Sequence, residues 1–204
     1  MIGIVDYGLG NISAFANIYE QLNIPVIFTK TESDLEKVSH IILPGVGSFD
    51  WAMKRLTESG MRDKLNHLVI VSKLPILGVC VGMQIMAKNS EEGAEKGLGW
   101  FNANVVRFNP DDIKSATKCP HLGWNNILPK MKNKLLNKLD KHSSFYFLHS
   151  YYLYPKDQNN IIAETNYGGL FTSAISKHNI YGVQFHPEKS HNCGMQLLKN
   201  FAGL

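Results

Sequence analysis

The stretch PILGVCVGMQIM, residues 75–86, joins an apolar run to a helix-like segment through a cysteine that two glycines flank. The run predicts a buried strand, and VGMQIMAKN (81–89) predicts a helix. Gly78 and Gly82 indicate a strand-to-helix turn too tight for a Cβ beside Cys80. The order G-V-C-V-G matches the G-x-S-x-G nucleophile elbow, with sulfur in place of oxygen. Cys80 is therefore a candidate nucleophile, although a cysteine after an apolar run is often only a small buried side chain.

The same alternation of apolar runs and helical patterns extends back from this turn to the N-terminus. Apolar runs at 2–5, 25–29 and 40–44 alternate with helix-like segments at 13–22, 33–38, 49–60 and 61–73, and Ser33 with Glu36 matches a capping box. Continuous apolar strands separated by helices are typical of a parallel sheet covered on both faces. The second half instead contains strand-like runs at 102–108, 143–154, 161–166, 170–176 and 180–185.

These patterns predict an α/β fold in three layers. We expect a mixed, mostly parallel central sheet with helices on both faces and antiparallel additions in the C-terminal half. No repeat or long linker divides the chain, so residues 1–204 are expected to form a single domain.

Composition excludes several classes of function. Of the 204 residues, 44% are hydrophobic and 19% charged, which is typical of a globular chain. The net charge of +4 comes without an arginine-rich or aromatic-basic cluster, so we expect no nucleic-acid partner. In residues 130–141, the lysines predict the solvent-exposed side of an amphipathic helix, with Met131, Leu135 and Leu139 on its apolar side. The alternative is that these lysines form a docking surface for a partner.

The sequence also predicts neither a membrane span nor a metal site. It has no apolar stretch long enough to span a bilayer and no signal-peptide pattern. Three cysteines without a CxxC pair fit a reducing cytoplasm, and we expect no metal site and no cofactor. Cys119 and Cys193 lack the glycine frame of Cys80 and are expected only to pack.

A thiol nucleophile needs a base, because an unperturbed cysteine is only a few per cent thiolate at neutral pH. The segment YGVQFHPEKS (181–190) offers His186 and Glu188. In an extended segment these two side chains face the same way, so the carboxylate could hold one imidazole nitrogen while the other takes the thiol proton. Alone, the segment is a weak signal and more often indicates a surface histidine beside a solvated glutamate. Together with Cys80, it predicts a Cys-His-Glu triad.

Acyl transfer also needs hydrogen-bond donors for the oxyanion. The backbone N–H of Val81, directly after the cysteine, is one candidate. The loop PGVG (44–47) is the other, through Gly45, Val46 and Gly47. Each such donor is worth about 3–4 kcal/mol of transition-state stabilisation. An ordinary turn after a strand would explain the loop equally well.

Over nearly its whole length, the chain resembles the class I (triad) glutamine amidotransferases, most closely the glutaminase subunits of imidazole glycerol phosphate synthase. The motifs that carry this resemblance are DYGLGN (6–11), PGVGSFDWAM (44–53), LGVCVGMQIM (77–86), SEEG (90–93), GLGW (97–100), PHLGWN (120–125), YFLHSYY (146–152) and QFHPEKS (184–190). PHLGWN, and PGVG in place of a loop with a doubled glycine, point to these subunits rather than to other triad relatives.

The resemblance implies that Cys80 attacks the carboxamide of glutamine and that His186 protonates the departing ammonia. Water activated by His186 would then hydrolyse the thioester to glutamate, and Glu188 would orient the histidine. Gln84 matches a position that helps to hold the substrate, and Ser150 and Tyr151 fall in the segment whose backbone lines the pocket.

The resemblance also implies a partner. Such subunits form a heterodimer with a synthase (cyclase) subunit, a (β/α)8 barrel that receives the ammonia through a sheltered channel and makes imidazole glycerol phosphate and AICAR in histidine biosynthesis. Asn11, Trp124, Tyr146 and Lys189 would lie on or near the shared face, although Trp124 could equally belong to the core. Because Val46 stands where relatives have glycine, we expect slow glutaminase activity until the partner and its ligand rearrange the loop.

Three alternatives remain open at this point. The same glutaminase chemistry could feed an amidotransferase that modifies surface sugars. A stand-alone cysteine hydrolase acting on γ-glutamyl substrates would need no partner. A degenerate subunit would only stabilise its partner, although all three triad positions are filled here.

Overall fold

The computed structural model describes residues 1–113 and 119–204 and is built on an eight-stranded sheet. The strands follow the order β2 (Val26–Thr29), β1 (Ile2–Val5), β3 (His40–Gly45), β4 (Ile76–Cys80), β13 (Ile180–Val183), β12 (Leu170–Lys177), β11 (Ile161–Asn166) and β8 (Leu128–Pro129). From β2 to β13 all neighbours are parallel, whereas β12, β11 and β8 add antiparallel pairs. The predicted mixed sheet, with antiparallel additions in the C-terminal half, is confirmed.

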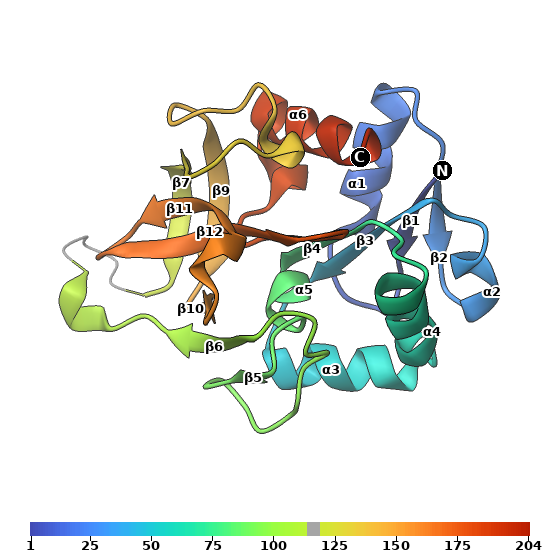
Figure 1. Ribbon diagram of the computed structural model, residues 1–204, viewed down its shortest axis with the longest axis horizontal. Coiled ribbons are helices and arrows are strands. Elements are labelled where there is room, and N and C mark those ends of the chain that lie inside the picture. The colour runs from blue at the N-terminus through green and yellow to red at the C-terminus, as the bar shows by residue number, and fades with distance from the viewer. Residues whose placement is uncertain (114–118) are drawn as a thin grey trace.

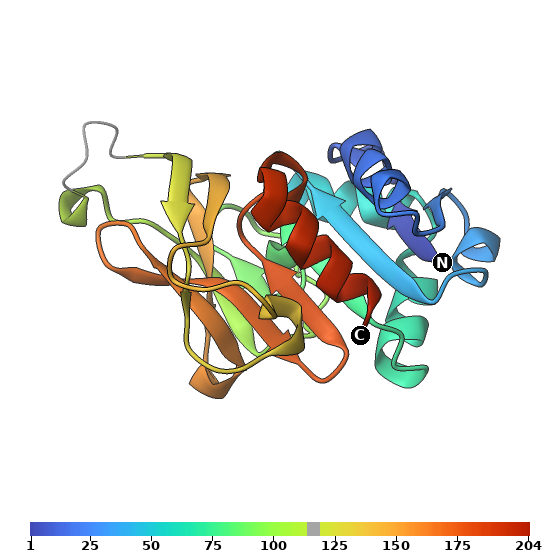
Figure 2. The ribbon, with the colours of Figure 1, turned by 90° about the horizontal axis from the view of Figure 1, so that it is seen from above.

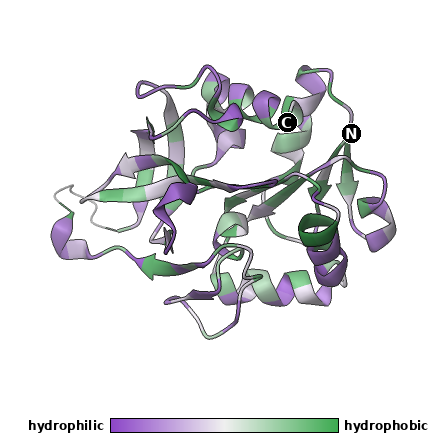
Figure 3. Cartoon of the chain, viewed as in Figure 1, coloured by the Kyte–Doolittle hydropathy of each residue, from purple (hydrophilic) through white to green (hydrophobic). Residues whose placement is uncertain are grey.

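Helices cover both faces of this sheet, which makes three layers (Figure 1). On one face lie α1 (Ile12–Gln21) and α6 (His191–Ala202), and Figure 2 shows both from above. On the other lie α3 (Phe49–Glu58), α4 (Arg62–Asn66) with a π-helical extension (His67–Val71), and the short α5 (Val81–Gln84). Strands β1 and β4 are buried at every position, as a sheet covered on both sides requires, and Figure 3 shows the hydrophobic colour concentrated there.

Two smaller sheets flank the antiparallel end of the central one. In the first, β6 (Ala103–Arg107) pairs with β5 (Asn89–Ser90) and β10 (Tyr151–Pro155); in the second, β7 (His121–Asn126) pairs with β9 (Ser144–His149). The predicted strand 143–154 is therefore divided at Ser150 between two sheets. Among the described residues, no helix has both the length and the apolar content to cross a bilayer.

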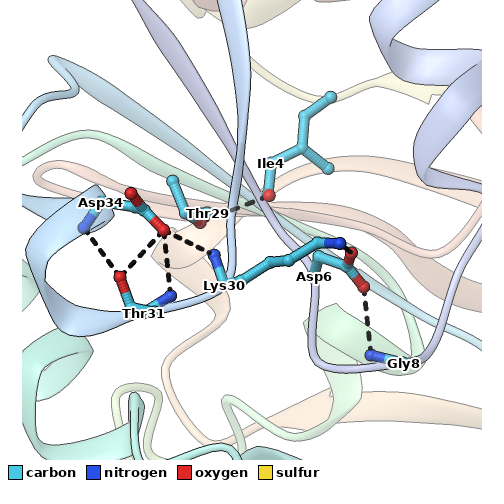
Figure 4. Close-up of polar contacts among 7 residues, drawn as sticks. All are labelled: Ile4, Asp6, Gly8, Thr29, Lys30, Thr31 and Asp34. Atoms are coloured by element: carbon cyan, nitrogen blue, oxygen red, sulfur yellow. Dashed lines mark hydrogen bonds and ion pairs between the residues drawn. The ribbon is translucent and has the colours of Figure 1, made fainter.

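The predicted capping box at Ser33 and Glu36 is wrong by two residues. The box of helix α2 (Glu32–Leu35) is formed by Thr31 and Asp34, so Ser33 lies inside the helix. The Thr31 hydroxyl accepts from the Asp34 N–H at 3.3 Å, and the Asp34 carboxylate accepts from the Thr31 N–H at 3.2 Å (Figure 4). Only Lys30 separates extended Thr31 from the end of β2, so the helix starts within three residues of the strand.

The lysine-rich segment 130–141 does not form the predicted amphipathic helix. It contains only a 3-10 turn, Lys134–Leu136, and Met131 is exposed. Adjacent Leu135 and Leu136 both enter the core, whereas one helix face would bury residues four apart. The Asn200 side chain on α6 donates to the Leu135 carbonyl at 2.9 Å and holds the irregular segment in place. An open hollow of about 1060 Å³ borders this segment and shares no residue with the cavity at Cys80.

Candidate active site

Cys80 sits at the end of β4 in a strained turn. Its φ of 55° and ψ of −116° lie where side chains other than glycine rarely occur. A Cβ on Gly78 would stand 2.7 Å from the Gly82 carbonyl oxygen, and a Cβ on Gly82 would overlap the Leu43 carbonyl oxygen of β3. The two glycines are therefore required at this turn, as the sequence predicts for a nucleophile elbow.

The helix after Cys80 is much shorter than predicted. The expected helix over 81–89 ends at Gln84, and Ile85 already acts as its C-cap. The chain then turns back toward the short strand β5 at Asn89. A single turn has few aligned peptide dipoles, so the helix dipole contributes less to thiolate stability than the sequence suggests. The remaining stabilisation of the thiolate must come from side chains around the sulfur.

The side chains of His186 and Glu188 meet as predicted, but the backbone conformation that brings them together is not the expected extended one. Only His186 is extended; Pro187–Lys189 form a 3-10 turn that brings the carboxylate back to the ring. The His186 Nδ1–Glu188 Oε1 distance is 2.8 Å, and the two side chains are only 4% and 2% exposed. The other oxygen, Oε2, is buried without a hydrogen-bond partner among the described residues. The carboxylate's hydrogen bonding is thus concentrated on the imidazole.

The imidazole and the thiol of Cys80 line the same cavity. Burial by itself would lower the pKa of His186, but the interactions with Cys80 and Glu188 outweigh it and raise that pKa well above its ordinary value. The proton therefore favours the imidazole when the thiol ionises. The carboxylate of Glu188 thus holds the ring, and the ring lines the cavity together with the sulfur.

A cavity of about 310 Å³ opens over the sulfur. Besides Cys80 and His186, seven of the residues singled out in the sequence line it: Val46, Gly47, Val81, Gln84, Ser150, Tyr151 and Lys189. Gly45 is not in the lining; it packs against the elbow, where a Cβ would come within 2.8 Å of the Val81 carbonyl carbon. Gly47, at φ +88°, gives the loop a bend that favours glycine, and the Val46 side chain is 41% exposed at the rim.

Two lining residues with polar side chains, Glu92 and His149, were not singled out from the sequence. The Glu92 carboxylate accepts from the Phe49 N–H at 2.8 Å, at the N-terminus of α3, and so adds negative charge to the wall. A carboxylate there can bind the ammonium group of an amino acid. Glu92 lies within the motif SEEG and His149 within YFLHSYY. A charged or aromatic side chain inside such a motif is the feature by which the sequence could have indicated a pocket residue.

The wall that carries Ser150 and Tyr151 is fixed by hydrogen bonds. The Tyr151 carbonyl accepts from Gln84 Nε2 at 2.9 Å and from His149 Nδ1 at 2.8 Å. His149 Nε2 in turn lies 3.1 Å from His121 Nδ1, within the β7–β9 sheet. Burial lowers the pKa of His149 to about 3 and that of His121 to about 4, so both rings are neutral at pH 7. The pair is a rigid support rather than an acid or base.

Aromatic side chains lie next to Lys189, one of the residues that line the cavity. Trp124 on β7, 51% exposed, faces Tyr146 on β9 across the strand pair at 6.1 Å and stacks on His191 at 5.1 Å. The Lys189 ammonium lies 5.6 Å from the centre of the Tyr146 ring. Asn11, also exposed, directly precedes α1. Trp124, Tyr146 and Lys189 thus form one surface patch, and the alternative that Trp124 belongs to the core is wrong.

A cysteine elbow and a His-Glu pair beside one small cavity suit acyl transfer through a thiol nucleophile, and comparison with known proteins agrees. The family "Glutamine amidotransferase class-I" matches residues 3–203. The chain belongs to the class-I glutamine amidotransferases. Among curated members of this class, "Imidazole glycerol phosphate synthase subunit HisH" of Leptospira interrogans is 53% identical over 204 residues, covering 100% of both chains. The protein of the same name from Bdellovibrio bacteriovorus is 50% identical over 202 residues, 99% of each.

Solved structures of glutamine amidotransferases share the fold. The glutaminase domain of Trypanosoma brucei CTPS, solved with bound acivicin, superposes with a TM-score of 0.67 at 17% identity, covering 99% of this chain and 93% of that one. At this identity the likeness shows the architecture only.

Proposed function

We propose that the chain is the glutaminase subunit of imidazole glycerol phosphate synthase and releases ammonia from glutamine for its synthase partner. The observation that carries the proposal is that Cys80 and His186 line one cavity of about 310 Å³, with Glu188 hydrogen-bonded to the other side of the imidazole. The curated relatives, 50–53% identical over essentially the full chain, carry the name of that subunit. These two lines of support are independent.

The reaction begins when Cys80 gives its proton to His186 and the thiolate attacks the side-chain carbonyl carbon of glutamine. The carbonyl electrons move to oxygen, where the Val81 N–H and the 44–47 loop provide donors. As the tetrahedral intermediate collapses, His186 passes its proton to the departing nitrogen, and ammonia leaves a thioester on Cys80. His186 then takes a proton from water as the water oxygen attacks the thioester carbonyl carbon. The C–S bond breaks, glutamate is released, and His186 returns the proton to the Cys80 thiolate.

The cavity fits the α-amino acid end of glutamine as well as its amide. Glu92 provides a carboxylate for the ammonium group, and Gln84 presents a carboxamide from the floor. Lys189 at the rim provides a positive charge for the α-carboxylate. We assign substrate binding to these residues and to the Ser150–Tyr151 backbone.

The exposed patch of Trp124, Tyr146 and Lys189 is the proposed docking surface for the synthase subunit, a (β/α)8 barrel, with Asn11 beside it. Large aromatic side chains that remain half exposed beside a catalytic cavity are typical interface anchors. Delivery through a closed complex suits ammonia, which bulk water would protonate. The three cysteines are free thiols, which suits work in the reducing cytoplasm.

The test uses the complex of this chain with its synthase subunit. Cys80→Ala should abolish product formation from glutamine and leave product formation from added ammonium salt unchanged. Cys193→Ala, which removes a partly buried thiol on α6, is the matched control and should retain both activities. Glutamine-dependent product from the Cys80→Ala complex would overturn the proposal. Efficient cleavage of γ-glutamyl peptides by the lone chain would favour a stand-alone hydrolase instead.

A further inference from the structure

Gln184 lies directly beneath the nucleophile and has no part in the mechanism above. It follows the last residue of β13, and its side chain is fully buried, with 0% exposure. Its Nε2 is 3.7 Å from the Cys80 sulfur, and its Oε1 is 3.1 Å from Gln84 Nε2. One carboxamide thus bridges the nucleophile and a residue of the substrate pocket.

Hydrogen-bond logic fixes which end of this carboxamide faces the sulfur. A backbone carbonyl can only accept, so the group that Gln84 places 2.9 Å from the Tyr151 carbonyl must be its NH2. The same NH2 lies 3.1 Å from Gln184, which must therefore present its oxygen there. The Gln184 NH2 is left pointing at the sulfur. Flipping Gln184 would set two donors against each other, so its orientation follows from the carbonyl of Tyr151.

The same logic orients Gln84 toward the substrate. Its two N–H bonds are used by the Tyr151 carbonyl and by Gln184. Its own carbonyl oxygen is the remaining polar atom of the side chain, and Gln84 lines the cavity. That oxygen can accept a hydrogen bond from an N–H group of the substrate.

The other groups around the sulfur cannot replace this donor. The Leu148 carbonyl oxygen, at 3.9 Å, can only accept. The Tyr7 hydroxyl donates to the Pro44 carbonyl at 2.6 Å, and burial followed by the Cys80 charge raises the pKa of Tyr7. The titratable and charged side chains that face this space come from several elements: Tyr7, Glu92, His149, His186, Glu188 and Lys189. Of these, His186 is the histidine whose pKa the interaction with Cys80 raises. The hydrogen-bond contacts of the sulfur among the described residues are with Gln184 Nε2 and the Leu148 carbonyl.

We propose that Gln184 is a catalytic residue: its N–H stabilises the Cys80 thiolate, while its oxygen holds Gln84 in position for glutamine. The inference rests on the proposed glutaminase function. The proton leaves sulfur for His186, and the negative charge left on sulfur is met by the imidazolium on one side and the Gln184 N–H on the other. When the thioester is hydrolysed, the same N–H stabilises sulfur as it departs as a thiolate.

The test measures alkylation of Cys80 by iodoacetamide from pH 5 to 9 without glutamine, following the Cys80 peptide by mass spectrometry. Gln184→Met keeps length and volume but removes the N–H. Because hydrogen bonds to charged groups are the stronger kind, the midpoint of the alkylation profile should rise by about one pH unit, with about tenfold slower alkylation on the acid side. Gln84→Met removes the partner that orients Gln184, so it should raise the midpoint by less than Gln184→Met does and should also raise the KM for glutamine. Gln196→Met on α6, where the carboxamide donates to Asn200, is the matched control and should leave the profile unchanged.

Glutaminase kinetics give a second readout in the complex with the synthase subunit. Gln184→Met should lower kcat about tenfold and also raise KM, since it releases Gln84, whereas Gln84→Met should act mainly on KM. If Gln184→Met does not fold, Gln184→Glu tests the same role. The new carboxylate keeps an oxygen for Gln84 but places a second oxygen, not an N–H, next to sulfur. The alkylation midpoint should therefore rise at least as far as expected for Gln184→Met.

A Gln184 variant that folds and shows the wild-type alkylation profile would overturn the inference. Failure of the proposed function is distinct from this result. It would appear as a wild-type complex that does not hydrolyse glutamine, and the alkylation comparison would still report whether Gln184 acts on sulfur.

Discussion

Replacing Glu188 by glutamine removes the charge behind the imidazole while keeping its shape. The Glu188–His186 contact is 2.8 Å long, and both side chains are at most 4% exposed, so water cannot compensate for the loss. A hydrogen bond to a charged group contributes about 1.5–3 kcal/mol and a neutral one about 1 kcal/mol. The imidazolium should therefore lose about 1–2 kcal/mol of support, which corresponds to a loss of about 5- to 30-fold in kcat.

The assay is glutamate release by the complex with its synthase subunit, over a range of glutamine concentrations. Since Glu188 does not line the cavity, KM should change little. Glu188→Ala, which also removes the group that orients the ring, should cost at least as much again. Glu58→Gln on α3, where the side chain is 47% exposed, is the control and should behave as wild type. A Glu188→Gln enzyme with wild-type kcat would refute the role given to this carboxylate.

Three further results are expected. Gly82→Ala places a methyl group against the Leu43 carbonyl, and backbone there cannot move aside. The free energy of unfolding in urea should therefore fall by about 3 kcal/mol, the upper end of what overpacking costs, and a fall below about 0.5 kcal/mol would contradict this. Trp124→Ala should weaken binding to the synthase subunit by tenfold or more in calorimetry, with little change in the unfolding of the lone chain; unchanged affinity would place the interface elsewhere. His149 and His121 have lowered pKa values in the folded state, so below about pH 6.5 the unfolded chain binds protons that the folded chain refuses. The free energy of unfolding should then fall with pH by up to about 1.4 kcal/mol per unit for each ring, and equal stability at pH 7 and pH 5 would disprove it.

Local patterns predicted most of the elements but misjudged how several of them end. The strand before Cys80 and the glycines around it follow from residue types alone, because a buried strand is apolar and a tight turn excludes a Cβ. The helix after Cys80 was overextended, since its apolar residues fit a helix as well as a buried turn. The lysine-rich segment failed for a related reason: contact with Asn200 on α6 fixes it in an irregular form that its own periodicity does not show.

By itself, the sequence determined the α/β architecture, the elbow with Cys80, and the pairing of His186 with Glu188, because each depends on neighbours along the chain or on a motif that recurs in a family. Only the tertiary structure decided which groups surround the sulfur. Gln184, Gln84 and the pair of His149 with Tyr151 come from three separate segments, and the direction of each hydrogen bond among them follows from a single carbonyl that can only accept. Such a network is set by distances between distant parts of the chain, and no local pattern of residues encodes those distances.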